Sequence, residues 1–237
     1  FPQLKNAKTK SEINKATKAL EKVAASIQGV KKHEEAVKQK DDLFRLIQTD
    51  AVEHMQTIPN NSINILCTDP IYGIDADSTS IGIGGKTGGI SSAGYKIEDA
   101  KEPALFFYEV LAKESFRFCT HDAHGYVFCG PEHFHTVRQL FLDAGWRAYI
   151  KPMIWIKNSS GQCNVPYAWP SSCYEMFLYI RKDASKLIKE GMPDWIQCPP
   201  VPSSEKTHPW EKPLDLIDNM LQRVSLPGQT LYDPFMG

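Results

Sequence analysis

Three features that would place the protein outside the cytoplasm are missing from the sequence. None of its six cysteines forms a CxxC pair, no apolar run is long enough to span a bilayer, and the first residues show no signal-peptide pattern. These absences exclude a disulfide-framed secreted domain, a zinc ribbon and an integral membrane protein. We therefore expect a cytoplasmic protein with reduced thiols and no membrane partner.

The chain also lacks a uniformly basic body. Its formal net charge is −1, yet residues 1–40 alone hold ten lysines and four glutamates, so the rest of the chain is acidic. A nucleic-acid partner would have to be met by local patches. With 237 residues, of which 42% are hydrophobic, the chain is long enough for one core, with or without an appendage.

Residues 1–42 are predicted to form an N-terminal helical arm. Apolar side chains alternate steps of three and four along a heptad seam, namely Ile13, Ala16, Leu20, Val23, Ile27, Val30 and Val37. One interpretation is a helix that packs on the body or on a second copy, which would make a homodimer. The alternative is that the lysine-rich face of the arm contacts DNA phosphates.

The rest of the chain is organised around Thr68-Asp69-Pro70-Ile71-Tyr72-Gly73, which follows the apolar strand predicted at 63–67. Ligands of open α/β sheets bind at such strand ends. Asp69 offers two acceptor oxygens, Pro70 offers a carbonyl and no N–H, and Tyr72 offers a ring for stacking. A planar ring with an exocyclic NH2 group fits this set, although an ordinary Asp-Pro turn is the alternative.

Two familiar site signatures are absent. The glycines at 82–89 do not make a P-loop, because the position that would need the first glycine is Ser80 and no strand leads into it. We expect residues 73–95 to form a loop that closes over a bound base, or else to be disordered. His133 and His135 stand at the start of a predicted helix without further ligands, so no metal site is expected.

Patterns elsewhere predict alternating strands and helices. Strands are expected at 43–47, 125–130, 153–157, 174–181 and 231–232, and helices at 51–58, 104–118, 132–144 and 213–224. The strand at 43–47 would pair in parallel with that at 63–67. The strands at 153–157 and 174–181 would form a hairpin at the sheet edge, and 183–207 would be irregular. Asp50 either caps a helix or accepts from a ribose or adenine group.

Taken in order, these motifs resemble the S-adenosylmethionine-dependent amino-group DNA methyltransferases of the β motif order. Asp69-Pro70-Ile71-Tyr72 is similar to the family's DPPY motif, and the strands at 153–157 and 174–181 carry its WxK and early Glu. His208-Pro209-Trp210-Glu211-Lys212-Pro213 resembles HPxxKP, and the segment 233–237 resembles the start of DPFxGSG. The resemblance covers residues 43–237 and leaves out the arm.

The resemblance implies a Rossmann-like α/β sheet with circularly permuted motif order, in which Asp69 lies close to Asp233. It implies catalytic roles for Asp69, Pro70 and Tyr72. The residues expected to bind S-adenosylmethionine are Asp50, Asp69, His208, Lys212, Asp233, Pro234, Phe235 and Gly237. The sequence departs from the family in having Ile71 where a second proline is usual. It also stops at Gly237, before the rest of the cofactor half, which predicts an incomplete catalytic domain.

The function implied is site-specific methylation of adenine N6 in DNA, with the base flipped out of the duplex and 183–207 contributing to target recognition. A bacterial or phage restriction–modification enzyme is the expected context. Two alternatives stay open. One is the same chemistry on cytosine N4, on RNA or on another amide. The other is a catalytically weak relative that serves as a DNA-binding or assembly module.

Overall fold

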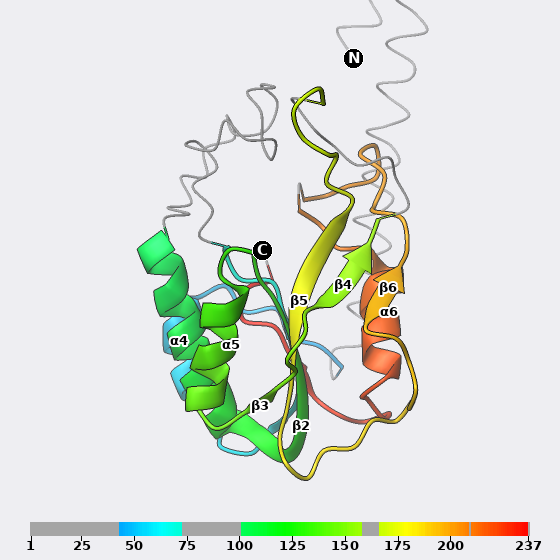
Figure 1. Ribbon diagram of the computed structural model, residues 1–237. Helices are drawn as coiled ribbons and strands as arrows, with labels where there is room; N and C mark the ends of the chain where they lie inside the picture. The colour runs from blue at the N-terminus through cyan, green and yellow to red at the C-terminus, as the bar shows by residue number, and fades with distance from the viewer. Residues whose placement is uncertain (1–42, 73–100, 158–165, 209, 237) are drawn as a thin grey trace, which may run out of the picture. The chain divides into compact units, whose positions relative to one another are not determined.

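A computed structural model describes residues 43–72, 101–157, 166–208 and 210–236 (Figure 1). The expected helical arm, the glycine-rich loop and Gly237 lie outside these residues. By its internal contacts the chain divides into two units, residues 1–48 and 49–237. In the described part of the first unit, residues 43–48, no regular secondary structure forms and the side chains are exposed. None of the described helices is long and apolar enough to cross a membrane.

The second unit is a mixed sheet between two layers of helices. Its strands are β1 (Ile63–Thr68), β2 (Cys119–Phe128), β3 (Arg147–Ala148), β4 (Met153–Ile156), β5 (Tyr174–Arg181), β6 (Trp195–Gln197) and β7 (Leu231–Tyr232). Its helices are α3 (Ala51–Thr57), α4 (Lys101–Phe118), α5 (Phe134–Asp143) and α6 (Leu214–Gln222). The strand order is β6-β4-β5-β2-β1-β7, with β3 beside β5. This is the α/β sheet that the sequence predicts.

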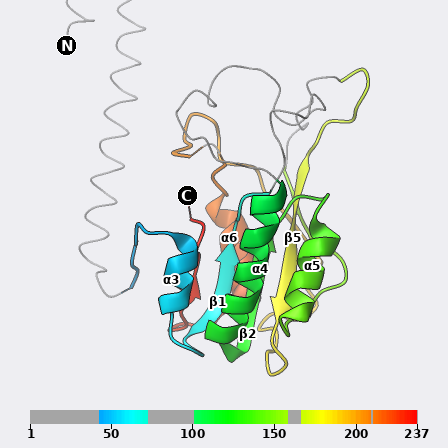
Figure 2. The same cartoon turned by 90° about the vertical axis from the view of Figure 1, so that its left-hand side faces the viewer.

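Alternating side chains of the central strands supply a core on each face of the sheet. On one face Leu66, Val127 and Leu178 belong to a cluster with residues of α3, α4 and α5. On the other, Cys67, Tyr126 and Phe177 join a cluster with α6. Because successive side chains of a strand point to opposite faces, a sheet buried on both faces requires largely apolar strands, as β1 and the second half of β2 are. Figure 2 shows the resulting layers, with α4 and α5 on one side of the sheet and α6 on the other.

The expected strand at 43–47 is wrong, and so is its parallel pairing with β1. Both edges of β1 are already occupied, by β2 on one side and β7 on the other, each in parallel. An apolar segment becomes a strand only where a neighbour supplies its backbone hydrogen bonds. The apolar pattern of Leu43–Ile47 was therefore not sufficient evidence for a strand.

The hairpin of β4 and β5 forms as expected, but it does not lie at the sheet edge. β5 pairs antiparallel with both β4 and β2, and the three-residue strand β6 adds in parallel to the outer side of β4. The segment 183–207 is thus not wholly irregular. A strand of three residues between prolines is too short to show periodicity, so its partner strand and the Arg223 side chain, which donates to the carbonyls of Pro193 and Trp195, define it.

Other boundaries shifted where polar residues interrupt an apolar pattern. β2 begins at Cys119, directly after α4, rather than at Gly125, because the exposed pair His121 and Asp122 stands within the strand. α5 and α6 are each shorter than expected, and β3 was not predicted because two residues carry no pattern. These differences leave the order of the central strands unchanged.

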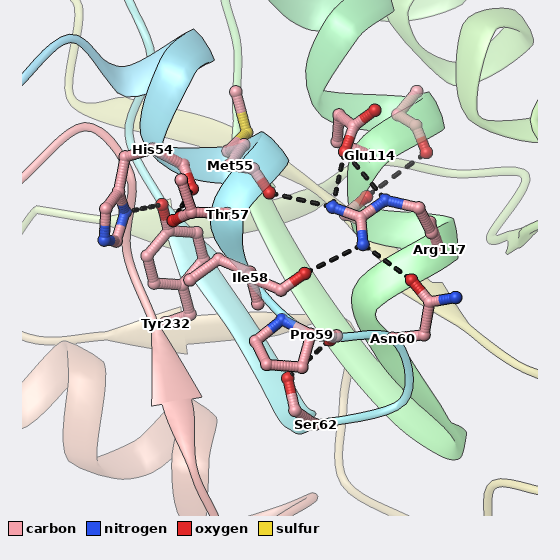
Figure 3. Close-up of polar contacts among 12 residues, drawn as sticks. His54, Met55, Thr57, Ile58, Pro59, Asn60, Ser62, Glu114, Arg117 and Tyr232 are labelled. Atoms are coloured by element: carbon pink, nitrogen blue, oxygen red, sulfur yellow. Dashed lines mark hydrogen bonds and ion pairs between the residues drawn. The ribbon is translucent and has the colours of Figure 1, made fainter.

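The Arg117 guanidinium fixes α3 to α4 (Figure 3). It donates to the carbonyls of Met55 at 2.9 Å and Ile58 at 2.8 Å, at the C-terminal end of α3, and also to Glu114 and to Asn60. On the opposite side of α3, His54 Nδ1 lies 2.8 Å from the Tyr232 hydroxyl of β7. A helix of only seven residues is marginal alone, so these contacts hold it against the sheet.

We expect Arg117→Ala to lower the free energy of unfolding by about 1–2 kcal/mol, because the carbonyls at the end of α3 lose a charged donor. The control is Lys113→Ala on the same helix, which removes only an exposed ion pair with Glu109 and should change stability by less than about 0.5 kcal/mol. Urea denaturation of the three proteins measures both effects. Equal stabilities for the two variants would show that Arg117 does not anchor α3.

Candidate active site

Two aspartates meet at the carboxyl ends of two neighbouring strands. Asp69 follows β1 and Asp233 follows β7, and these strands pair in parallel, so both residues leave the sheet at the same edge. The Thr68 hydroxyl donates to Asp233 Oδ1, which also accepts the backbone N–H of Phe235 at 3.0 Å. The expected closeness of Asp69 and Asp233 is confirmed. This edge is where open α/β sheets bind their ligands.

A chain of alternating charges runs from Asp69 across the same edge. Lys212 Nζ, from the segment before α6, forms an ion pair with Asp69 Oδ2 and lies 3.3 Å from Glu175 Oε2. Lys157, just beyond β4, lies 2.5 Å from the other oxygen of Glu175, near the start of β5. Antiparallel pairing of β4 with β5 brings these two residues to one edge. The four side chains therefore form one neutral, largely buried network.

The second oxygen of Asp69 has no hydrogen-bond partner among the described residues. Oδ1 is buried from solvent, and no hydrogen-bond donor reaches it from the residues that the structure describes. A buried acceptor without a donor carries a free-energy cost, which a bound donor would relieve. The carboxylate thus has one oxygen held by Lys212 and one available to a ligand N–H.

Burial and pairing together set the charges of the site. Burial raises the pKa of the Asp69 carboxyl, and Lys212 only partly opposes this. Burial would also raise the pKa of Glu175, but Lys212 and Lys157 hold it below the usual value. For Lys212, burial favours the neutral amine, yet the two carboxylates raise its pKa above the usual value. Lys212 therefore stays an ammonium at neutral pH.

Tyr72 joins the aromatic wall of the site to the ion network. Its ring packs against the buried cluster that includes Phe128 and Trp155, and its hydroxyl lies 3.4 Å from Glu175 Oε2. The hydroxyl is also near Asp69, where it lowers the pKa of that carboxyl, although its hydrogen-bond geometry is to Glu175. Pro70, between Asp69 and Tyr72, is buried. The segment after β1 thus presents an acceptor and a ring side by side.

The other residues expected to bind the cofactor are dispersed. Asp50 is the N-cap of α3 and accepts the Glu53 backbone N–H at 3.0 Å, so the helix-cap interpretation describes its present contact. Phe235 packs edge-on against Phe107, and Pro234 precedes it in the same turn after β7. His208 is exposed, and its ring accepts the backbone N–H of Trp210. Their roles toward a cofactor stay predictions.

Glu175 and Lys157 were not predicted as site residues. The sequence carried a signal for them, since each stands at the end of a predicted strand of a hairpin, and paired strand ends share a sheet edge. Thr68 was missed as well, because its contact with Asp233 spans 165 residues of sequence. Among the described residues, no group of three or more His, Cys, Asp or Glu side chains is arranged to hold a metal ion.

Asp233 gives the protein a pH dependence of stability. Burial raises the pKa of its carboxyl from 3.8 to about 6. The folded state therefore binds a proton that the unfolded state has released, and stability falls as pH rises from about 4 to about 6. Asp233→Asn, which keeps the acceptor for Thr68 and Phe235, should remove this loss and gain roughly 1–2 kcal/mol relative to the parent between pH 4 and pH 7.

Urea denaturation of both proteins at several pH values checks this prediction. The difference in unfolding free energy between variant and parent should be smallest near pH 4 and should level off above pH 7. A difference that is independent of pH would show that Asp233 titrates normally in the folded protein. Asp122→Asn, an exposed aspartate in the N-terminal half of β2, is the control and should show no such trend.

Comparison with known proteins identifies the family to which this arrangement belongs. The family model described as DNA methylase, for the N6/N4 enzymes, matches residues 63–237. A curated relative, the candidate methylase YubD of Escherichia coli, is 24% identical over 195 residues, which span 82% of this chain and 76% of that protein.

Solved structures share the fold. The PvuII DNA methyltransferase, which is cytosine-N4-specific, superposes with a TM-score of 0.57 at 13% identity, over 78% of this chain and 71% of that one. M1.HpyAVI gives 0.53 at 16% identity over 81% of each chain. A candidate DNA modification methylase from Thermus thermophilus, solved with S-adenosylmethionine, gives 0.53 at 19% identity over 79% and 77%. The likeness of fold agrees with the family match, which covers the whole of the sheet and both aspartates at its edge, and the chain belongs to the N6/N4 DNA methylase family.

Proposed function

We propose that the protein transfers a methyl group from S-adenosylmethionine to the exocyclic N6 amine of adenine in DNA. The observation that carries this proposal is Oδ1 of Asp69, which is buried, has no hydrogen-bond partner among the described residues and lies near Tyr72. An acceptor next to a stacking surface fits an amino group on a planar base. The family match and the fold shared with an S-adenosylmethionine complex support the choice of methyl donor.

Asp69 and Pro70 act on the electron pair of the amine. In adenine this pair is delocalised into the ring, which makes the amine a poor nucleophile. Hydrogen bonds from the two amine hydrogens to Asp69 Oδ1 and to the Pro70 carbonyl localise the pair on nitrogen. The N–C bond then forms as the C–S bond of the sulfonium breaks, and the cationic amine that results releases a proton to Asp69. Positioning supplies most of the catalysis.

Residues near Asp233 would hold the methyl donor. Asp233, Pro234 and Phe235 directly follow β7, the neighbour of the strand that leads to Asp69, so a sulfonium held there would face the amine. Asp50, at the N-cap of α3, is proposed as a second contact, and His208 and Gly237 as further ones. In duplex DNA the amine is out of reach, so the target base must be flipped into the site, with Tyr72 stacking on it.

Cytosine N4 is the second candidate acceptor. It presents the same amino geometry, and a structure with the same fold is named as a cytosine-N4-specific enzyme. Adenine is favoured because Asp69 stands at the first position of the DPPY-like motif, where cytosine enzymes of the family often have serine. The segment 183–207 is proposed to contribute to target recognition, and a restriction–modification system is the proposed context.

The test is to identify the methylated nucleoside. DNA is incubated with the protein and isotope-labelled S-adenosylmethionine, digested to nucleosides and analysed by mass spectrometry. Label in N6-methyldeoxyadenosine is expected. Label in N4-methyldeoxycytidine would select the second candidate. Label only in an RNA control would exclude DNA as the substrate. Cofactor binding without any labelled nucleoside would favour a catalytically weak DNA-binding relative.

A further inference from the structure

We propose that Lys212 is a positioning residue for Asp69, held in place by Glu175 and Lys157, and that it is not a ligand of the cofactor. This inference rests on the proposed methyl transfer, because it concerns how the acceptor of the amine is oriented. Lys212 belongs to the HPxxKP-like segment, for which the resemblance implied cofactor binding. The contacts of its ammonium point elsewhere.

Three acceptor oxygens of the protein surround Lys212 Nζ. The ammonium donates to Asp69 Oδ2 and to the Trp210 carbonyl, the latter at 3.5 Å, and Nζ lies 3.3 Å from Glu175 Oε2. The ring of Phe128 covers the ammonium at 5.0 Å from its centroid. Because an ammonium has three donors, these contacts use its hydrogen-bonding capacity within the protein.

This arrangement fixes which oxygen of Asp69 meets a ligand. A free carboxylate turns about its Cβ–Cγ bond and exchanges its two oxygens. With Oδ2 paired to Lys212, the carboxylate is locked, and Oδ1 is the oxygen left without a partner among the described residues. A single fixed acceptor aligns the amine with the methyl group, which is the condition for in-line attack.

Glu175 and Lys157 form the outer support. Glu175 Oε1 contacts Lys157, and Oε2 contacts Lys212 and the Tyr72 hydroxyl. Lys157 itself lies 4.9 Å above the Trp155 ring, so the end of the network is anchored on the buried face of β4. Removing either cation would leave a buried carboxylate uncompensated.

The groups that face Asp69 make its charge depend on Lys212. Around the carboxylate lie one cation and several acids, namely Lys212, Tyr72, Glu175, Asp233, Cys67 and Cys129. Lys212 is the only cation in this set of described residues. Without it, burial and the neighbouring carboxylates both favour the protonated acid, which accepts a hydrogen bond from the amine more weakly than the carboxylate and is too weak a base to take up the proton that the amine releases.

The test compares Lys212→Met, which removes the ammonium, with Lys212→Arg, which keeps a cation, and with Lys113→Met as an exposed control. Three quantities are measured: cofactor affinity by calorimetry, the pKa of the Asp69 carboxyl by NMR in protein without cofactor, and the pH profile of kcat. For Lys212→Met we expect the Asp69 pKa and the acidic limb of kcat to move up together by at least about one unit, and kcat at pH 7 to fall roughly 100-fold.

In the same variant the Kd for S-adenosylmethionine should stay within about threefold of the parent, and Lys212→Arg should recover part of the loss in kcat. If Lys212→Met does not fold, Lys157→Met gives the same test in milder form, because it loosens the partly exposed end of the network. A Kd raised more than about tenfold with an unchanged Asp69 titration would overturn the proposal and make Lys212 a cofactor ligand.

The readouts separate this proposal from the proposed function. A parent protein that methylates no nucleoside would overturn the proposed reaction. The Asp69 titration in Lys212→Met would then still decide whether Lys212 controls the carboxylate, because NMR needs neither DNA nor turnover. An Asp69 pKa that is the same in parent and variant would refute the positioning role, whatever the protein methylates.

Discussion

Asp69→Asn should reduce methyl transfer by on the order of 1,000-fold while leaving S-adenosylmethionine affinity within a few fold. Asparagine has nearly the shape of aspartate, but it can present a hydrogen-bond donor where aspartate presents an acceptor. The amide oxygen will turn toward the Lys212 ammonium, since that cation needs an acceptor. The amide NH2 group then occupies the place of Oδ1 and presents a donor to the donor hydrogens of the target amine.

Labelled methyl transfer to DNA measures the rate, and calorimetry measures cofactor affinity. Asp122→Asn is the matched control, because Asp122 is exposed in the N-terminal half of β2, where it accepts the Thr120 hydroxyl. It should retain the parent rate. Parental methylation by Asp69→Asn would show that the acceptor of the amine lies elsewhere. A large loss of cofactor affinity would assign Asp69 to the methyl donor rather than to the base.

Lys182→Met should lower the free energy of unfolding by about 2–4 kcal/mol, the largest stability effect that we expect from a change away from the site. Lys182 follows β5, and its relative exposure is only 7%. Its ammonium donates to the carbonyls of Phe116 and Cys119, each at 2.6 Å, where α4 passes directly into β2. It also lies 4.4 Å from the Phe116 ring centroid.

Methionine fills a similar volume but donates to neither carbonyl, so two acceptors at the junction of α4 and β2 lose a charged partner. The control is Lys189→Met, because Lys189 is exposed and, among the described residues, its ammonium bonds to the side chain of Gln222 and to no buried carbonyl. It should change stability by less than about 0.5 kcal/mol in urea denaturation. Equal stabilities for the two variants would mean that water replaces the ammonium at no cost.

The sequence predicted the central elements because their patterns are long and consistent. β1 and β5 are mostly apolar, and α4 has 18 residues of helical pattern, so each was predicted near its observed bounds. The expectation failed for short or interrupted segments. Leu43–Ile47 looked like a strand, but β1 already pairs with β2 and β7, whereas β6 looked irregular until β4 supplied its hydrogen bonds.

In the candidate site, too, features within one segment were predictable and contacts between distant segments were not. Asp69 and Tyr72 were predictable because strand, carboxylate and ring are contiguous, and position within a segment is local information. The partners of Asp69 were not. Lys212 stands 143 residues away, and its contact with the carboxylate depends on the segment before α6 returning to the edge where β1 ends. Sequence separation hides such a contact even when both residue types are conspicuous.

The sequence by itself determined the class of sheet, the acceptor–ring motif after β1 and the expectation that Asp69 and Asp233 meet. Periodicity specifies which side chains are buried, and parallel strands bring their carboxyl ends to one edge. Only the tertiary structure decided which side chains of the site contact one another. Burial and distance determine that Lys212 pairs with both Asp69 and Glu175, and that Oδ1 of Asp69 has no partner among the described residues, because charge pairing in a buried site depends on three-dimensional proximity.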